Sequence, residues 1–221
     1  MSADLGKERA GRFAAGFVES GMTVGLGSGS TVAYTIAALG EKALDIVCVA
    51  TSKRTEALAR KLRLKLATPD EVKRLDIAID GADEVDPMCH LIKGGGGAHT
   101  REKIVAEMAD RFVVVVDESK LVDGLGRFGV PVEVLDFAPG IVTSRLEALG
   151  AEAVAMISER TDNGNVLLRA SFESIEDPLE LAASISAIPG VVEHGLFLNW
   201  CVARVIVGTN EGQVRQVFPP H

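Results

Sequence analysis

The sequence predicts an α/β protein in which a ferredoxin-like α+β domain is inserted into a Rossmann-like parallel-sheet domain. Two observations support this fold class. In the first half of the chain, short apolar runs rich in β-branched residues alternate with helical stretches, as in a parallel sheet covered by helices. After residue 127 the order becomes strand, helix, strand, strand, helix, strand, which is the order of a ferredoxin-like unit.

The first half of the chain supplies the parallel sheet. We expect helices near residues 3–20, 31–39, 54–62 and 100–109. We expect the strands between them at residues 22–26, 45–50, 75–79 and 112–116.

The second half supplies the inserted domain. We expect its strands at residues 130–135, 153–158, 166–171 and 191–197, and its helices at residues 138–149 and 178–188. The turn signal TDNGN separates the second and third of these strands. A last apolar run at 202–207 is expected to return to the first sheet. The expected domains are therefore residues 1–128 plus 203–221, and residues 129–202.

Composition excludes several classes of function. The chain has 221 residues, 47% of them hydrophobic, and a mean hydropathy of +0.23, which is ample for a packed core. Its net charge of −8 comes without a basic stripe, so we expect no nucleic-acid partner. No apolar run approaches the roughly 20 residues that span a bilayer, and the N-terminus is charged where a signal peptide is apolar. We therefore expect a cytoplasmic protein without a membrane partner.

The cysteines and histidines show neither a disulfide framework nor the spacing of metal ligands. Cys48, Cys89 and Cys201 are odd in number and far apart, and we expect Cys48 and Cys201 to be buried apolar residues. No metal and no cofactor is expected, so the chemistry should rest on carboxylates and lysines.

Residues 80–103, DGADEVDPMCHLIKGGGGAHTREK, form the candidate active site. The segment is too polar and too rich in glycine for ordinary core, and it follows a predicted strand, where parallel sheets bind ligands. Its carboxylates Asp80 and Asp83 face one cavity if the chain turns at Gly81, whereas the alternative is a solvated acidic turn. The acids of this segment lack the register of a calcium-binding loop.

Lys93 and the four glycines after it suit an oxyanion or an enediolate, because a cation stands beside unencumbered backbone N–H groups. Ordering four glycines is costly, and close approach of a ligand explains them better than a linker does. Glu102 falls in the first turn of the next predicted helix, where the helix dipole favours its ionised form. It is either a proton shuttle or a capping glutamate.

Three further segments follow strands at the same predicted edge of the sheet. Residues 25–31, GLGSGST, suit a phosphate at a helix N-terminus without matching the dinucleotide or Walker patterns; the alternative is a capped tight turn. The hydroxyls of residues 51–55 either line the same crevice or cap the following helix. Lys120 is either a cation for phosphate or a solvated loop residue.

The motifs GLGSGSTV, DGADEVD, LIKGGGGAHTREK, DESK, PVEV, TDNGN and IPGVVEHGLF together resemble, in order and spacing, the type A ribose-5-phosphate isomerase family. The resemblance runs nearly end to end. It implies an aldose–ketose isomerase that interconverts ribose 5-phosphate and ribulose 5-phosphate in the non-oxidative pentose phosphate pathway, without a metal or other cofactor. It also implies a sugar phosphate as substrate and a homodimer or homotetramer as the assembly.

The resemblance assigns roles to individual residues of this sequence. It implies that Glu102 moves a proton between C2 and C1, and that Lys93 with the amides after it stabilises the oxyanion. Asp80 and Asp83 are expected to bind sugar hydroxyls and to assist ring opening. The implied substrate-binding residues are Ser28, Gly29, Ser30, Thr31, Asp80, Gly81, Ala82, Asp83, Lys93, Gly94, Gly95, Gly96, Lys120 and Lys7.

Two residues depart from the family's KGGGAALTREK. Gly97 replaces an alanine and His99 replaces a leucine. We expect Gly97 to loosen the loop. His99 either changes the pH dependence as a histidine near the base or faces solvent without a role, and we expect the second.

Two other functions use similar parts. A sugar-phosphate sensor of a transcription regulator shares such a sheet and phosphate loop, but it needs a DNA-binding helix pair and a basic surface, which we do not expect here. A transferase would use Glu102 as a covalent nucleophile on a thioester. Lys93 and the short chain argue against a bulky thioester carrier.

Overall fold

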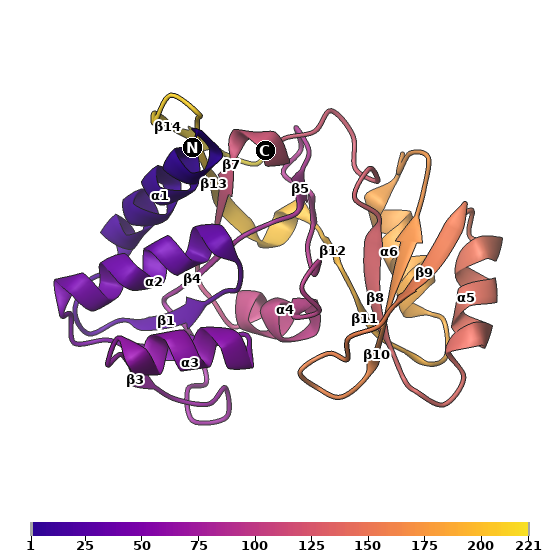
Figure 1. Cartoon of the computed structure of the whole chain (residues 1–221), viewed down its shortest axis with the longest axis horizontal. Coiled ribbons are helices and arrows are strands. Elements are labelled where there is room, and N and C mark those ends of the chain that lie inside the picture. Colours follow the sequence, from indigo (N-terminus) through magenta and orange to yellow (C-terminus); the bar gives the residue numbers. More distant parts are fainter. Residues whose placement is uncertain (1, 221) are drawn as a thin grey trace. The chain divides into compact units, whose positions relative to one another are not determined.

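A seven-stranded sheet organises the first of two units in the computed structural model, which describes residues 2–220 (Figure 1). Its strand order is β14-β13-β7-β4-β1-β2-β3, and every neighbouring pair is parallel except β13 with β14. The strands are β1 Thr23–Leu26, β2 Val47–Ala50, β3 Lys65–Leu66, β4 Ile77–Asp80, β7 Phe112–Asp117, β13 Val202–Gly208 and β14 Val214–Val217. The predicted parallel sheet is confirmed, and the run at 202–207 joins it beside β7.

Helices cover both faces of this sheet. They are α1 Ser2–Ala14, α2 Ser30–Lys42, α3 Lys53–Lys61 and α4 His99–Glu107, with the 3-10 helices η1 Ala15–Phe17, η2 Glu118–Lys120 and η3 Asn199–Cys201. In Figure 1, α2 lies between α1 and α3. Buried residues of these three helices pack with alternate residues of β1, among them Val24 and Leu26. On the other face Val105 of α4 lies against Gly25, where a larger side chain would collide with it.

The chain divides into units that each take more than one segment. The first comprises Met1–Ala82, Arg101–Leu121 and Trp200–His221, and the second comprises Asp83–Thr100 and Val122–Asn199. This division assigns residues 83–100 to the second unit. The domain boundaries that we expect from the sequence, with 129–202 as the smaller domain, stay a prediction.

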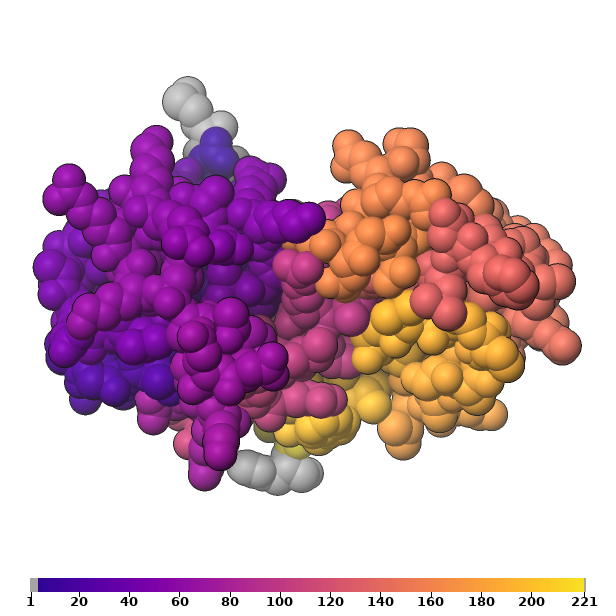
Figure 2. All heavy atoms as spheres, turned by 90° about the horizontal axis from the view of Figure 1, so that it is seen from below, coloured from indigo at the N-terminus to yellow at the C-terminus, as the bar shows by residue number. Residues whose placement is uncertain are grey.

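The second unit is built on a four-stranded antiparallel sheet with the order β11-β8-β10-β9. Its elements are β8 Val130–Val134, α5 Pro139–Ala148, β9 Ala153–Ile157, β10 Val166–Ser171, α6 Pro178–Ser186 and β11 Val191–His194. This is the predicted ferredoxin-like order. Val132 packs in one core with Leu146 of α5 and Ile185 of α6, so both helices cover the same face of the sheet. Both helical segments, salmon and golden, are visible at the surface in Figure 2.

The expected strand at 191–197 is wrong as a single strand. It breaks at Gly195, and its end, β12 Leu196–Phe197, pairs instead with β6 Leu91–Ile92, which pairs with β5 Glu84–Val85. The N–H of Gly195 donates to the Pro131 carbonyl at 2.7 Å, and a Cβ on Gly195 would collide with the Lys93 carbonyl. The missing side chain therefore lets the chain pass from one sheet to the next.

Local capping explains where several helices begin. The Ser52 side chain accepts the N–H of Thr55 at 3.0 Å at the start of α3, and Asp177 accepts two N–H groups at the start of α6, which opens on Pro178.

Among residues 2–220, no helix is both long and apolar enough to cross a membrane. Cys48 is buried as expected, whereas Cys201 is only half-buried.

Candidate active site

The loop after β1 is held by the carboxylate that ends β4. Asp80 Oδ1 accepts the backbone N–H of Ser28 at 2.9 Å and that of Gly81 at 2.7 Å, and the Asp80 side chain is buried. A Cβ on Gly27 would collide with this carboxylate, so the loop requires glycine there. Because β1 and β4 flank the point where the strand order reverses, this is the edge at which a parallel sheet binds ligands.

Ser28 also contacts three hydroxyl groups in the segment after β2. Its Oγ lies 3.0 Å from Thr51 Oγ1, 2.7 Å from Ser52 Oγ and 3.1 Å from Thr55 Oγ1. Ser52 also caps α3, so the capping role considered for residues 51–55 is present. The hydroxyls contact the β1 loop, and their place in a ligand crevice stays a prediction.

The β1 loop, residues 27–30, turns into α2 at Gly29, whose φ is 120°. Ser30 begins the helix and is exposed, and Thr31 follows it in the first turn. Exposed N–H groups at the start of a 13-residue helix, together with the helix dipole, favour a phosphate. A helix thus begins directly after the loop, as the expected phosphate cradle requires, and phosphate binding there stays a prediction.

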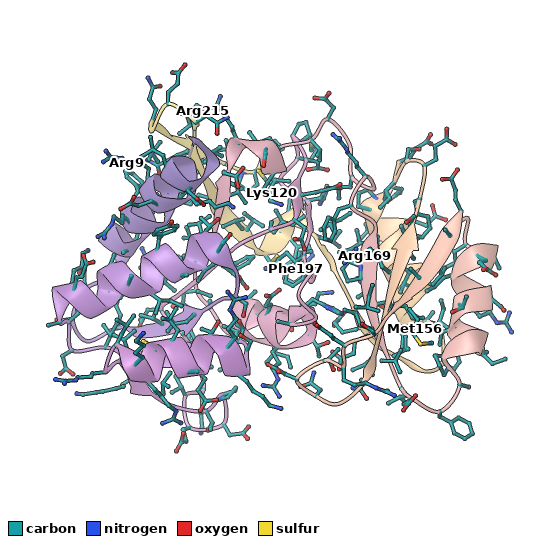
Figure 3. All side chains as sticks on the ribbon, viewed as in Figure 1. Arg9, Lys120, Met156, Arg169, Phe197 and Arg215 are labelled. Carbon is teal, nitrogen blue, oxygen red and sulfur yellow. The ribbon has the colours of Figure 1, made fainter. Side chains whose placement is uncertain are left out.

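Lys120 and Lys7 lie at the same edge of this sheet. Lys120 ends η2, the short turn that follows β7, and is half-buried (Figure 3). Lys7 follows Gly6 in α1, and Gly6 packs against Gly208 at the end of β13. Parallel β7 and β13 end at the edge that also carries the β1 loop, so both lysines add positive charge to this edge.

Glu102 lies in the first turn of α4, as predicted, and is 5% exposed. The first turn of a helix favours the ionised form of a carboxylate. The helix itself is fixed to the sheet through Val105 against Gly25. A buried carboxylate on a rigid helix has the properties required of a general base.

In the second unit, Asp83 holds the glycine loop, residues 94–97. Its Oδ2 accepts the N–H of Gly95 at 2.8 Å, and its own N–H donates to the Ile92 carbonyl at 2.8 Å. A Cβ on Gly95 would collide with the Phe128 ring, which lies against the loop. The predicted Asp83 and Gly95 are therefore in direct contact.

Lys93 is buried at the end of β6, with only 2% of its surface exposed. Its N–H donates to the Gly195 carbonyl at 2.8 Å, and its ammonium lies 5.3 Å from the centroid of the Phe197 ring, labelled in Figure 3. Lys93 is thus a buried cation immediately before the glycine loop.

The glycine loop is an ordered turn. The N–H of Gly97 donates to the Gly94 carbonyl at 2.9 Å, and Gly94 and Gly97 have φ values of 100° and 72°. Gly97 therefore closes the turn, and the loosening expected from this extra glycine stays a prediction. Among residues 2–220, the N–H groups of Gly94 and Gly96 donate to no protein acceptor, which leaves two backbone donors for a ligand.

The expectation for His99 is wrong. The side chain is fully buried, its Nε2 donates to the Glu193 carbonyl at 3.2 Å, and its ring lies against Gly94. Burial follows from its place at the start of α4, directly after the glycine loop, where the ring packs beneath the turn. His99 thus fixes the loop to β11.

Two buried carboxylates of the second unit were not predicted as functional residues. Glu84 accepts the backbone N–H groups of Gly126 and Phe128, and so holds the segment that carries the Phe128 ring. Glu133 accepts hydrogen bonds from four side chains. Its motif, PVEV, gave no sign of this role, because the partners lie 28 to 33 residues away in the sequence.

The predicted residues therefore form two sets. The set in the first unit belongs to the sheet and its helices and comprises Ser28–Thr31, Asp80, Gly81, Glu102, Lys120 and Lys7. Ala82 also belongs to this unit, as the last residue of its first segment. In the second unit, Asp83, Lys93 and Gly94–Gly96 belong to the glycine loop and its supports. Among the described residues, no three His, Cys, Asp or Glu side chains are grouped as a metal site requires.

The fold and these two sets define an α/β protein of the Rossmann-like class that has a phosphate-type loop, buried carboxylates and a buried lysine. The sequence model of ribose 5-phosphate isomerase A (phosphoriboisomerase A) matches residues 47–212. The chain is 50% identical over 228 aligned residues to ribose-5-phosphate isomerase A of Thermosynechococcus vestitus, with 96% of each chain covered.

Solved structures agree. The fold matches a D-ribose-5-phosphate isomerase in complex with phospho-erythronic acid, with a TM-score of 0.95, 41% identity, and coverage of 99% of this chain and 100% of that one. It matches ribose 5-phosphate isomerase A of Methanocaldococcus jannaschii with a TM-score of 0.91, 43% identity, and coverage of 97% and 98%. The chain therefore belongs to the ribose 5-phosphate isomerase A family, and it is an enzyme, an isomerase.

Proposed function

We propose that this enzyme interconverts D-ribose 5-phosphate and D-ribulose 5-phosphate through an enediolate. The observation that carries the proposal is the segment 93–102, which supplies a buried cation, backbone donors and a buried carboxylate within ten residues of one another. An aldose–ketose isomerisation needs these three kinds of group, because a proton leaves carbon while negative charge develops on oxygen.

Glu102 is the general base of the proposed reaction. It takes the proton from C2 of the open-chain aldose, the electron pair forms the C1–C2 double bond, and negative charge develops on O1. The proton then returns to C1, while the hydroxyl proton moves from O2 to O1, which gives the ketose. A positioned base contributes roughly 10² to 10⁴ in rate.

Lys93 and the free donors of the glycine loop stabilise the developing oxyanion. The ammonium is buried, and the N–H groups of Gly94 and Gly96 have no protein acceptor among residues 2–220. Charges and dipoles fixed in a dry site act strongly on developing charge, and one such donor is worth about 10² to 10³ in rate. The N–H of Gly95 does not serve the oxyanion in this proposal, because it donates to Asp83 Oδ2.

The β1 loop binds the phosphate in this proposal. Ser28, Gly29, Ser30 and Thr31 offer hydroxyls and N–H groups at a helix N-terminus, and Lys120 and Lys7 supply charge at the same edge. These phosphate-binding residues lie outside the segment 93–102, which carries the base.

Asp80 and Asp83 bind the sugar hydroxyls and assist ring opening. Each carboxylate uses one oxygen to hold a loop, Oδ1 in Asp80 and Oδ2 in Asp83. Gly81 and Ala82 lie between them and contribute backbone groups. A carboxylate held in this way is oriented before the sugar binds, which lowers the entropic cost of positioning.

The pathway, the location in the cell and the assembly of the enzyme belong to the same proposal. The reaction is one step of the non-oxidative pentose phosphate pathway, carried out in the cytoplasm without a metal or other cofactor. A homodimer or homotetramer is the proposed assembly; exposed apolar side chains on the second unit, among them Phe137, Ile141 and Leu179, support it.

Glu102→Gln tests the assignment of the base. We expect kcat to fall by roughly 10² to 10⁴, because the amide cannot accept the proton, while the affinity for phospho-erythronic acid, measured by calorimetry, stays close to that of the wild type. Glu107→Gln, at the exposed end of the same helix, is the matched control and should retain kcat. Wild-type turnover in Glu102→Gln would refute the assignment.

A further inference from the structure

Glu133 is a fully buried carboxylate in the middle of β8. Its neighbours Val132 and Val134 pack with α5 and α6, so by strand alternation Glu133 points to the opposite face of the four-stranded sheet. Directly across from it are Leu167 of β10 and Glu193 of β11. A buried charge on an otherwise apolar strand requires a set of compensating partners.

Those partners are four side chains. Thr161 Oγ1 donates to Glu133 Oε1 at 2.8 Å, Asn165 Nδ2 to Oε1 at 2.7 Å, and Asn163 Nδ2 to both oxygens at 3.1 and 3.2 Å. The fourth is the hydroxyl of Thr100, which donates to Oε2. Burial raises the pKa of Glu133, but these hydrogen bonds together outweigh burial and hold the pKa below its ordinary value.

Three of the partners belong to one turn, residues 161–165, and this turn is also closed without Glu133. The N–H of Thr161 donates to the Asn165 carbonyl at 3.1 Å, that of Gly164 to the Thr161 carbonyl at 2.9 Å, and that of Asn165 to Thr161 Oγ1 at 3.2 Å. The fourth partner, Thr100, lies outside this turn, in the first turn of α4.

The sheet face opposite α5 and α6 therefore supports the end of the glycine loop and the start of α4 together. Besides Thr100 on Glu133, His99 donates to the Glu193 carbonyl. Contacts on β8 and β11 thus fix where the loop ends and where the helix begins.

We propose that Glu133 is a positioning residue, which holds the first turn of α4 through Thr100 and so sets the position of the base two residues further along the helix. The inference rests on the proposed role of Glu102. Residues of a helix rise about 1.5 Å each, so Thr100 and Glu102 are only about 3 Å apart along the axis. A shift of the hydroxyl anchor is therefore transmitted to Glu102 almost undiminished, and misplacement of a catalytic group by about 1 Å costs about 10²-fold in rate.

Matched substitutions separate positioning from support of the fold. Thr100→Val removes the hydroxyl on α4, and Thr161→Val removes the hydroxyl on the turn; both lose one hydrogen bond to the same carboxylate. We expect Thr100→Val to lower kcat by roughly 10- to 100-fold with KM nearly unchanged, and Thr161→Val to retain kcat even where its Tm falls. Thr100→Ser, which keeps the hydroxyl, should restore kcat.

Hydrogen exchange at the start of α4 supplies a readout that does not depend on catalysis. The amides of residues 101–103 should exchange faster in Thr100→Val and in Glu133→Gln than in Thr161→Val. Equal losses of kcat in Thr100→Val and Thr161→Val, or unchanged exchange in Thr100→Val, would overturn the inference. Faster exchange with unchanged kcat would show that Thr100 anchors the helix without positioning the base, and would also overturn the inference. Glu102→Gln tests the base itself, so failure of the proposed function is separated from failure of the positioning role.

Discussion

At the residue scale, position 27 requires glycine, because the Asp80 carboxylate occupies the space that a side chain would fill. Asp80 reaches the N–H of Ser28 only because nothing projects from the residue before it. The sequence indicated a glycine-rich turn but not which glycine faces a carboxylate, because that depends on a strand more than 50 residues away. The same limit explains the wrong expectation for His99, whose burial depends on β11.

Gly27→Ala should therefore cost both stability and activity. The new Cβ displaces the Asp80 carboxylate, and overpacking of this kind destabilises by roughly 1–3 kcal/mol. Gly16→Ala is the control, because Gly16 lies in the same unit, has no neighbour within 4 Å of an added Cβ, and has no positive φ. Urea unfolding and kcat/KM measure the two effects. Equal behaviour of the two variants would contradict the role given to Gly27.

At the scale of elements, the strands and helices follow from local patterns, whereas their interruptions do not. Alternation and turn signals predict the ferredoxin-like order, and the expected strand 166–171 coincides with β10. The break at Gly195 was not predicted, because the run 191–197 is continuous in sequence and is divided only by the close approach of Lys93. The short strands β5 and β6 were missed since they lie inside a polar segment.

The Glu133 carboxylate on β8 should make the free energy of unfolding depend on pH. The folded pKa of Glu133 lies below its ordinary value, so its ionised form contributes stability above the unfolded pKa of about 4.3, and this contribution is lost as the pH falls toward the folded pKa. Between pH 6 and pH 3.5, the free energy of unfolding should fall more steeply in the wild type than in Glu133→Gln. Denaturant titrations at several pH values measure both slopes, and parallel slopes would show that folding does not lower the pKa of Glu133.

At the scale of the whole molecule, each unit is built from more than one segment of the chain, and three of the proposed catalytic residues lie, in the sequence, close to a change of unit. Asp80 and Asp83 stand on either side of the change of unit after Ala82, and Glu102 follows the change after Thr100. The sequence predicted this segment as the candidate site from its polarity and glycines. Its supports in the second unit, Glu133 and His99, required the folded sheet.

The central claim is that Glu102 moves the proton of the sugar. It is tested by incubating the enzyme with ribose 5-phosphate in deuterium oxide with EDTA, and by following ketose formation and deuterium at C2 of the re-isolated aldose. We predict that the wild type forms ketose and introduces deuterium at C2, and that Glu102→Gln does neither while still binding phospho-erythronic acid. Deuterium uptake by Glu102→Gln at the wild-type rate would contradict the account.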